Sequence, residues 1–404
     1  MTRGPIRPGN PRAAPVDSIV ALLQALVRIP SRAGEDELGP VLHCIESWFD
    51  ERGLRYRRLH GPAGEALGLY AEVQGGQDGP WTVLDATLDT AGFGNPASWT
   101  RPPTSAAIDD GWLHGRGSAD SKAGVALFAH LLHEFAAAPA AFAGRFGVLF
   151  DLDEHSGRFG GARAFFDQPF EGGPPPRPDG VVIGYPGMDQ IVTGGRGFLR
   201  ARLAVHGVAA HSGATRERGL NAIGRAVALA HALDGMPLPA ADAGFALPPQ
   251  LTLTGIHAGN ESFSQVPDLC DLRLDLRLTP AFTDDAARRQ VERTVRQCDA
   301  AHTGARPTAI EWIAGWPAYQ VPDAHPLVAA LRAAGHAELG LELPTAVVGP
   351  SNIGNYLASL NVPALCGFGV HGENIHAADE RAALDSIGPV YRIYRDALQR
   401  LRRG

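Results

Sequence analysis

The chain has few cysteines, and their spacing excludes the sites that cysteines usually build. Only four occur in 404 residues, at Cys44, Cys270, Cys298 and Cys366. No two of them are close enough in sequence to form a zinc knuckle or a redox-active pair. We interpret them as buried, reduced thiols, and this interpretation predicts a cytoplasmic protein.

The sequence also lacks long apolar runs and an excess of positive charge. No window approaches the roughly 18 apolar residues that a membrane span needs, and residues 1–15 lack the apolar region of a signal peptide. Lys and Arg total 36 against 43 Asp and Glu, which gives a formal net charge of -7. A nucleic-acid-binding surface would appear as a basic patch. The composition therefore predicts neither a membrane nor a nucleic-acid partner.

What is present is a globular chain with two styles of patterning. Residues 1–15, rich in Pro, Arg and Gly, are expected to form a flexible tail. Strand-like and helix-like segments alternate over residues 16–193 and again over 307–404, and this alternation predicts one α/β domain with a largely parallel sheet. Residues 194–306 combine half-buried strands with two helices, which predicts an inserted α+β domain.

One segment delivers an acid to the start of a helix. Gly115 and Gly117 follow a short strand-like run and permit backbone turns that a β-carbon would block, and Asp120 comes next, just before a helical run. Open α/β sheets place their functional sites at such strand-to-helix turns. A carboxylate at this position can bind a cation, although the same residue alone could also be a helix N-cap.

A second segment ends an apolar strand with an acid and an imidazole. Glu154 and His155 follow the apolar run 146–152 and precede a glycine-rich stretch. An acid at the end of a buried strand is costly unless it is paired or functional. The alternative is a solvated loop acid beside a surface histidine.

A third segment supplies another imidazole. His376 follows the apolar run 364–368, and Glu380 lies four residues later, where it could hydrogen-bond an imidazole. A lone histidine is most often structural. One acid and two imidazoles in three such segments together predict a metal centre.

The ordered set of motifs resembles the metallo-exopeptidase and deacylase family of acetylornithine deacetylase, succinyl-diaminopimelate desuccinylase, aminoacylase and glutamate carboxypeptidase. The resemblance extends from about Ile19 to Leu398. The segments that carry it are Trp99 with Pro102 and Pro103, Asp110–Leu113 before the Gly-Arg-Gly turn, Gly207–Gly213 with Asn221–Ile223, and Val266–Asp268 followed by Asp275–Arg277.

This resemblance implies a two-domain fold. It implies a mixed-sheet, zinc-exopeptidase-like catalytic domain over residues 16–193 and 307–404, interrupted by a lid and dimerisation domain at 194–306. The lid implies a homodimer, since the lid histidine of the family acts across the subunit interface and stabilises an oxyanion. At the matching position this chain has His211.

The resemblance also implies roles for other residues. In the family, two zinc ions are held by a His-x-Asp motif, a bridging Asp, a Glu-Glu pair, the acid of a Gly-Glu-Pro motif and a late His. The bridging Asp matches Asp120, the general base matches Glu154, and the late His matches His376. Asp89 matches the acid that supports the first ligand.

Three ligand positions depart from the family pattern. Thr87 stands where the first His belongs, His155 replaces the second Glu of the pair, and Tyr185 replaces the acid of Gly-Glu-Pro. Hydroxyl and phenol groups are poor zinc ligands. Asp120, His155 and His376 remain as competent ligands for one ion.

We therefore expect a single divalent metal ion, zinc by preference, with iron, manganese or cobalt as alternatives. A metal-free protein and a relocated two-metal centre stay open. The predicted activity is hydrolysis of an amide bond in an N-acyl amino acid or small peptide-like substrate, with Glu154 as general base. The alternatives are a non-hydrolytic enzyme, such as an isomerase, lyase or acyl transferase, and a non-catalytic relative.

The expected substrate is a small molecule that carries a carboxylate. The resemblance assigns its binding to Arg277 and to the segment Ser351–Asn352, with Asn221 as a further candidate, and a planar guanidinium pairs well with a carboxylate. In the non-hydrolytic alternative, Tyr185 and Glu154 would act as an acid/base pair.

Overall fold

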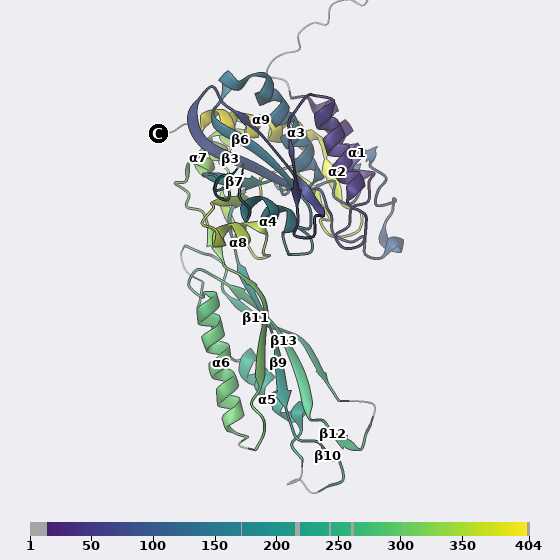
Figure 1. Ribbon diagram of the computed structural model, residues 1–404, viewed down its shortest axis with the longest axis vertical. Helices are drawn as coiled ribbons and strands as arrows, with labels where there is room; N and C mark the ends of the chain where they lie inside the picture. Colours follow the sequence, from purple (N-terminus) through teal and green to yellow (C-terminus); the bar gives the residue numbers. More distant parts are fainter. Residues whose placement is uncertain are drawn as a thin grey trace, which may run out of the picture. The chain divides into compact units, whose positions relative to one another are not determined.

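The computed structural model describes residues 14–170, 172–214, 219–241, 244–259, 262–302 and 304–401. The expected tail at residues 1–15 lies outside this part apart from its last two residues. The chain forms two compact units (Figure 1). The first contains the described residues of Met1–Thr193, Val321–Ala346 and Val362–Gly404, and the second contains those of Gly194–Gln320 and Val347–Asn361.

The second unit is larger than the insertion predicted at 194–306. Strand β14 (Ala309–Trp316) pairs antiparallel with β9 (Gly197–His206), so it belongs to the sheet of the second unit. The later segment Val347–Asn361, which holds α8 (Ile353–Ser359), also belongs to this unit. The alternating pattern of residues 307–404 concealed this return, because pattern alone does not tell which sheet a strand joins.

The first unit is an α/β layer structure built on a mixed sheet. Its helices are α1 (Val16–Val27), α2 (Gly39–Asp50), η1 (Pro96–Ser98), α3 (Lys122–Ala137), η2 (Pro139–Ala141), α4 (Gly160–Phe166), α7 (Pro326–Leu339) and α9 (Leu384–Arg400). Its strands are β1 (Arg57–His60), β2 (Ala66–Gln74), β3 (Gln77–Thr87), β4 (Ala107–Asp109), β5 (Trp112–His114), β6 (Ala143–Asp151), β7 (Gly180–Ile183), β17 (Ala364–Cys366), β18 (Gly372–Glu373) and β19 (Arg381–Ala383).

The main sheet has the strand order β1-β2-β6-β3-β7-β17. Strands β6, β3, β7 and β17 run parallel, whereas β1 and β2 are antiparallel additions. This confirms the predicted α/β class with a mixed sheet. Because parallel strands end at the same edge, the residues that follow β3, β6 and β7 are brought together, and such edges are where open α/β sheets place their sites.

Helices cover both faces of this sheet. A β-carbon on Gly124 of α3 would lie 3.1 Å from the Ala86 Cβ on one face, and one on Gly161 of α4 would lie 2.7 Å from the Asp151 Cβ on the other. Glycine at both positions therefore lets each helix start close against the strands. Apolar residues of α1, α2, α3, α7 and α9 form the core of this unit.

The second unit packs two helices on an antiparallel sheet. Its elements are β8 (Ile191–Gly195), where the chain enters, β9, β10 (Ala210–His211), α5 (Ala222–Asp234), β11 (Gln250–Ala258), β12 (Gln265–Val266), β13 (Leu269–Leu278), α6 (Asp284–Ala300), β14, β15 (Tyr319–Gln320), β16 (Thr345–Val348), where the chain re-enters, and α8.

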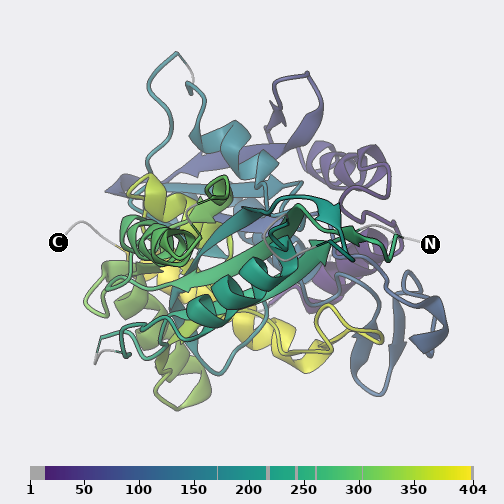
Figure 2. The same cartoon turned by 90° about the horizontal axis from the view of Figure 1, so that it is seen from below.

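The main sheet of the second unit has the order β11-β13-β9-β14. Strands β9 and β13 alternate apolar and charged residues, so each presents an apolar face to one side. Helices α5 and α6 pack on that side (Figures 1 and 2). The opposite side carries a cross-strand ion pair between Arg202 and Asp271 at 2.8 Å.

Two further features bear on the expectations from composition. In the described part of the chain, no helix has the length and apolar character that crossing a membrane requires. No disulfide joins any of the four cysteines there.

Candidate metal centre

Asp120 lies in the turn that leads from β5 into α3. Gly115 and Gly117 have φ values of 145° and 81°, so both use backbone conformations that favour glycine. The Asp120 side chain is buried, with 8% of its surface exposed. Its Oδ1 atom has no hydrogen-bond partner among the described residues. A buried carboxylate oxygen without a partner is costly, which makes this atom a candidate ligand.

The turn is held by a buried ion pair. One oxygen of Glu380 accepts hydrogen bonds from the backbone N–H groups of Ala119 and Asp120, at 3.1 Å each. Its other oxygen accepts from Arg116 at 2.7 Å, and the two side chains are 0% and 2% exposed. The expectation that Glu380 hydrogen-bonds an imidazole is wrong, because its oxygens are directed to the backbone of this turn and to Arg116. Glu380 therefore fixes the backbone that presents Asp120.

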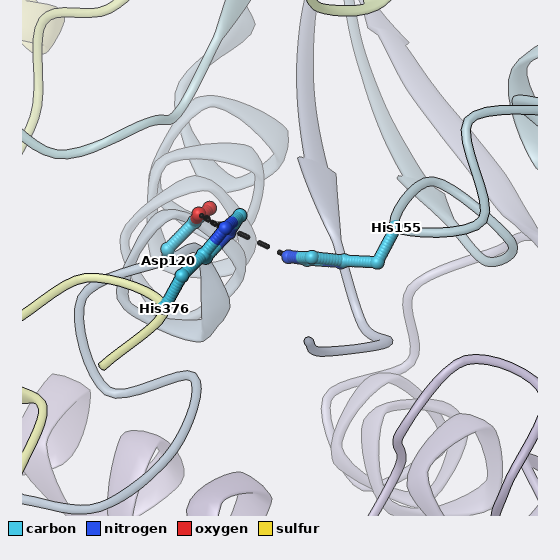
Figure 3. Close-up of side chains that lie close together, drawn as sticks. All are labelled: Asp120, His155 and His376. Carbon is cyan, nitrogen blue, oxygen red and sulfur yellow. Dashed lines mark hydrogen bonds and ion pairs between the residues drawn. The ribbon is translucent and has the colours of Figure 1, made fainter. Parts of the chain in front are cut away.

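Two histidines converge on Asp120 from distant segments (Figure 3). The Nε2 atom of His376 lies 3.0 Å from Asp120 Oδ2, and Nε2 of His155 lies 3.9 Å from the same oxygen. One potential ligand atom from each residue falls within 4.8 Å of the others. In the described part of the chain this is the only cluster of three or more such residues that could hold a metal ion.

The backbone at His376 is unusual in a way that matches this position. Its φ of 62° lies in the left-handed region, which is uncommon for residues other than glycine and concentrates at functional sites. The His376 side chain is 56% exposed, whereas that of His155 is 5% exposed. The cluster therefore has one buried imidazole and one at the surface.

Charge–charge contacts dominate the ionisation of this cluster. Burial alone would raise the pKa of Asp120, but its contacts with His155 and His376 lower that pKa below its usual range. Burial alone would lower the pKa of His155, but contacts with Asp120 and Asp89 raise it well above normal. These contacts therefore favour an ionised Asp120 carboxylate within the cluster.

Glu154 lies beside the cluster and contacts Tyr185. The Tyr185 hydroxyl donates a short hydrogen bond to Glu154 Oε1, and Glu154 Oε2 lies 3.4 Å from His155 Nδ1. Burial raises the pKa of the Glu154 carboxyl. Burial, together with the charge of Glu154, raises the pKa of Tyr185 well above its usual value. In this arrangement the Tyr185 hydroxyl is a hydrogen-bond donor to Glu154.

Thr87 lies at the end of β3 and forms a hydrogen bond with a neighbouring side chain. Its hydroxyl donates a 2.6 Å hydrogen bond to Asp89 Oδ1. Asp89 is completely buried and also accepts from the backbone N–H groups of Glu154 and His155, at 3.2 and 3.1 Å. Thr87 thus contacts the acid that the resemblance assigned to ligand support.

Sequence reasoning missed two buried acids on the same face of the sheet. Asp85 lies two residues before Thr87, and Asp151 pairs with Thr87 on the neighbouring strand. Both are 1% exposed. Three of their four carboxylate oxygens have no hydrogen-bond partner among the described residues, and burial raises both pKa values well above normal. Only the sheet register brings them together, so no signal in the linear sequence marks them as a pair.

The predicted substrate-binding residues lie in the second unit. Arg277 donates to Ser351 Oγ at 3.4 Å and forms an ion pair with Asp275 at 2.8 Å. Arg196, which sequence reasoning missed, accepts a hydrogen bond from Ser351 at its backbone carbonyl. The neighbouring charge of Arg277 adds to burial in lowering the Arg196 pKa. The Arg196 guanidinium itself donates to the backbone carbonyls of Gly349 and Pro248, at 3.4 and 3.2 Å.

The other predicted residues of this unit have structural partners. The Asn352 side-chain oxygen accepts from Gly354 N–H and from the Tyr319 hydroxyl, and caps α8. The Asn221 side-chain oxygen accepts from Ile223 N–H and caps α5. His211 is exposed, and its Nδ1 accepts from the Gly213 backbone at 3.0 Å.

Fold and site together define a class: a mixed-sheet α/β protein with an inserted α+β unit and a carboxylate–imidazole cluster that could hold a metal ion at the carboxyl edge of its parallel strands. Residues 83–400 match the family described as "Peptidase family M20/M25/M40". The match covers well over half of the chain. The chain therefore belongs to this peptidase family and is a hydrolase of that class.

Individual relatives agree with this assignment along nearly the whole chain. A succinyl-diaminopimelate desuccinylase of Bordetella petrii is 26% identical over 391 residues, which cover 95% of this chain and 98% of the relative. The fold resembles aminopeptidase PepT of Bacillus cereus, with a TM-score of 0.75, 18% identity, and coverage of 96% of this chain and 99% of the other. It also resembles a dinuclear metal-binding M20 peptidase of Bacillus subtilis, with a TM-score of 0.69, 17% identity, and coverage of 95% and 97%.

Proposed function

We propose that this protein hydrolyses an amide bond in an N-acyl amino acid or small peptide-like substrate, with one divalent metal ion held by Asp120, His155 and His376. The observation that carries the proposal is the convergence of these three side chains within 4.8 Å next to Glu154. Membership of a peptidase family and the desuccinylase names of its relatives support an amide as the bond that is cleaved.

The residues present fit one ion. A carboxylate and two imidazoles are typical zinc ligands, and three protein ligands leave a position open for catalysis. The orphaned Oδ1 atom of Asp120 supports this fit. When bound, such an ion supplies Lewis acidity, which polarises a carbonyl and lowers the pKa of water.

The residues present do not fit a second ion. The Thr87 hydroxyl is committed to Asp89, and the Tyr185 phenol donates to Glu154 and keeps its proton. Neutral hydroxyl groups are poor zinc ligands. We therefore propose one ion here, in contrast to the two that the description of the Bacillus subtilis peptidase implies for that protein.

Glu154 is proposed as the general base. Its carboxylate is buried beside the cluster, and burial raises its pKa toward the range in which a base works best near neutral pH. The hydrogen bond from Tyr185 fixes one carboxylate oxygen and leaves the other directed toward His155. In this role Glu154 accepts a proton from the attacking water and returns it to the leaving nitrogen.

We propose that Arg277 and Ser351, with Arg196, bind the carboxylate of the substrate. The Arg277 guanidinium contacts the Ser351 hydroxyl, and the neighbouring positive charge of Arg196 adds to the attraction for an anion. Asn352 and Asn221 are weaker candidates, because their side-chain oxygens cap helices. His211 remains the proposed oxyanion donor, and a homodimer through the second unit and a cytoplasmic location remain predictions from sequence.

One observation favours a second function. The Tyr185–Glu154 hydrogen bond could serve as an acid/base pair for a non-hydrolytic reaction that needs no metal. This alternative predicts that activity survives in metal-free protein and in His155→Ala.

The metal content of protein purified without chelator, measured by elemental mass spectrometry, tests the proposal together with assays on N-succinyl and N-acetyl amino acids and dipeptides. We expect about one ion per subunit and a loss of activity of about 100-fold or more in Glu154→Gln. About two ions per subunit would contradict the single site. Activity in metal-free protein would favour the second function, and unchanged turnover in Glu154→Gln would exclude both.

A further inference from the structure

The buried carboxylate of Asp89 makes more contacts with the segment Glu154–His155 than with the strand that precedes it, β3. Oδ1 accepts from the Thr87 hydroxyl at 2.6 Å and from the Glu154 backbone at 3.2 Å. Oδ2 accepts from the His155 backbone at 3.1 Å and lies 3.4 Å from His155 Nδ1. One carboxylate thus contacts both the main chain and the ring of His155.

The two nitrogens of the His155 ring face different partners. Nε2 is directed toward Asp120 and His376 (Figure 3), and Nδ1 lies on the side of Asp89. A histidine that binds a metal through one nitrogen usually donates its other N–H to a carboxylate, which fixes the tautomer and the ring orientation. The buried Nδ1 atom makes no hydrogen bond to a described residue, and the nearest acceptors given for it are carboxylate oxygens at 3.4 Å.

We infer that Asp89 is the positioning residue of His155, and that the Thr87 hydroxyl holds Asp89 in that role. In this arrangement the Nδ1 proton of His155 is directed to Asp89 and the Nε2 lone pair is left for the ion. Thr87 has a function of its own, because its hydroxyl fixes the Asp89 oxygen that does not face the ring. This inference rests on the single-ion site proposed above and extends it.

A competing carboxylate lies at the same distance. Glu154 Oε2 is also 3.4 Å from His155 Nδ1. Two observations favour Asp89: it is completely buried, and three donors besides the ring hold its two oxygens in place. Glu154 is held by the Tyr185 hydroxyl through its other oxygen. Glu154 therefore provides a matched control, since it tests whether any neighbouring carboxylate would serve.

The test is the affinity for zinc alone, measured by competition with a chromophoric chelator on wild type and four variants. We expect Asp89→Asn to weaken zinc binding about 10- to 100-fold, as is usual when the carboxylate behind a metal-binding histidine is removed. Thr87→Val, which keeps the shape and removes the hydroxyl, should weaken it by about 10-fold. Thr87→Ser, which keeps the hydroxyl, should bind zinc as tightly as wild type. The zinc affinity of Glu154→Gln should stay within about threefold of the wild-type value.

Thermal unfolding of each metal-free variant shows whether it is folded, and the Thr87→Val and Thr87→Ser pair provides a test even if Asp89→Asn does not fold. The inference would be overturned if Asp89→Asn bound zinc as tightly as wild type. It would also be overturned if Thr87→Ser lost as much zinc affinity as Thr87→Val. A larger loss in Glu154→Gln than in Asp89→Asn would transfer the role to Glu154. Wild-type protein that binds no zinc would refute both this inference and the proposed function. Zinc binding without amide hydrolysis would refute only the proposed function.

Discussion

Removing Arg116 should show how much the buried Arg116–Glu380 ion pair contributes to the stability of the first unit. Arg116→Met leaves the Glu380 carboxylate without its cation in a position where the two side chains are 2% and 0% exposed. Breaking a buried pair by removing one partner costs about 3–5 kcal/mol, because the remaining charge is uncompensated. We expect the free energy of unfolding of the first unit to fall by about that amount.

A second substitution should reverse much of this loss. In Arg116→Met/Glu380→Gln the remaining group is neutral, and the amide oxygen of glutamine can still accept from the Ala119 and Asp120 backbone N–H groups, now 3.1 Å from Glu380. The double variant should therefore be more stable than Arg116→Met by about 2 kcal/mol or more, since the desolvation penalty of the charge is gone.

The pH dependence gives an independent check with a defined sign. Burial raises the pKa of Glu380, whereas Arg116 lowers it. Without Arg116 the folded-state pKa therefore rises further above the unfolded value of about 4.3. A carboxyl with a raised folded pKa contributes stability that is present below the unfolded pKa and is lost as the pH rises through the folded pKa. Arg116→Met should be less stable than the double variant, and this difference in the free energy of unfolding should grow from pH 5 to pH 8.

The assay is urea-induced unfolding of chelator-treated protein, followed by tryptophan fluorescence at several pH values. Removing metal keeps ligand binding out of the comparison. The reasoning would be refuted by a double variant no more stable than Arg116→Met, or by a deficit that does not change between pH 5 and pH 8.

Two further predictions concern His130 and Tyr185. Burial lowers the His130 pKa to about 4, so its neutral form contributes stability that is present above the unfolded pKa of 6.5 and is lost as the pH falls toward 4. Between pH 7 and pH 5, the free energy of unfolding of wild type should fall by about 2 kcal/mol more than that of His130→Gln. Equal losses in the two proteins would show that His130 is not the group responsible. The hydrogen bond from Tyr185 lowers the Glu154 pKa, so Tyr185→Phe should move the acidic limb of the kcat/KM profile to higher pH. A limb that stays in place or moves to lower pH would contradict Glu154 as the base.

Local sequence patterns determined the elements and the family. Helix α7 (Pro326–Leu339) has Pro326 in its first turn and Gly340 after its last, and these residue types favour the two ends of a helix. The glycines of the turn before Asp120 could be identified for the same reason: the requirement for positive φ lies in the residue itself.

Pairings between distant residues could not be obtained in this way. Asp89 contacts His155 across 66 positions, and Glu380 contacts the Asp120 backbone across 260. The register of β3 and β6, which places Asp151 beside Thr87, depends on strand pairing that no local pattern specifies. The return of residues 347–361 to the second unit was missed for the same reason.

The sequence by itself thus determined which chemical groups this protein has and which family it belongs to, because residue types and motif order are local properties. Only the tertiary structure decided which partner each group contacts. Thr87 binds Asp89 and Tyr185 binds Glu154. Two imidazoles face Oδ2 of Asp120, and its Oδ1 has no hydrogen-bond partner among the described residues. These contacts follow from packing between segments far apart in the chain, and the proposed single-ion site depends on them.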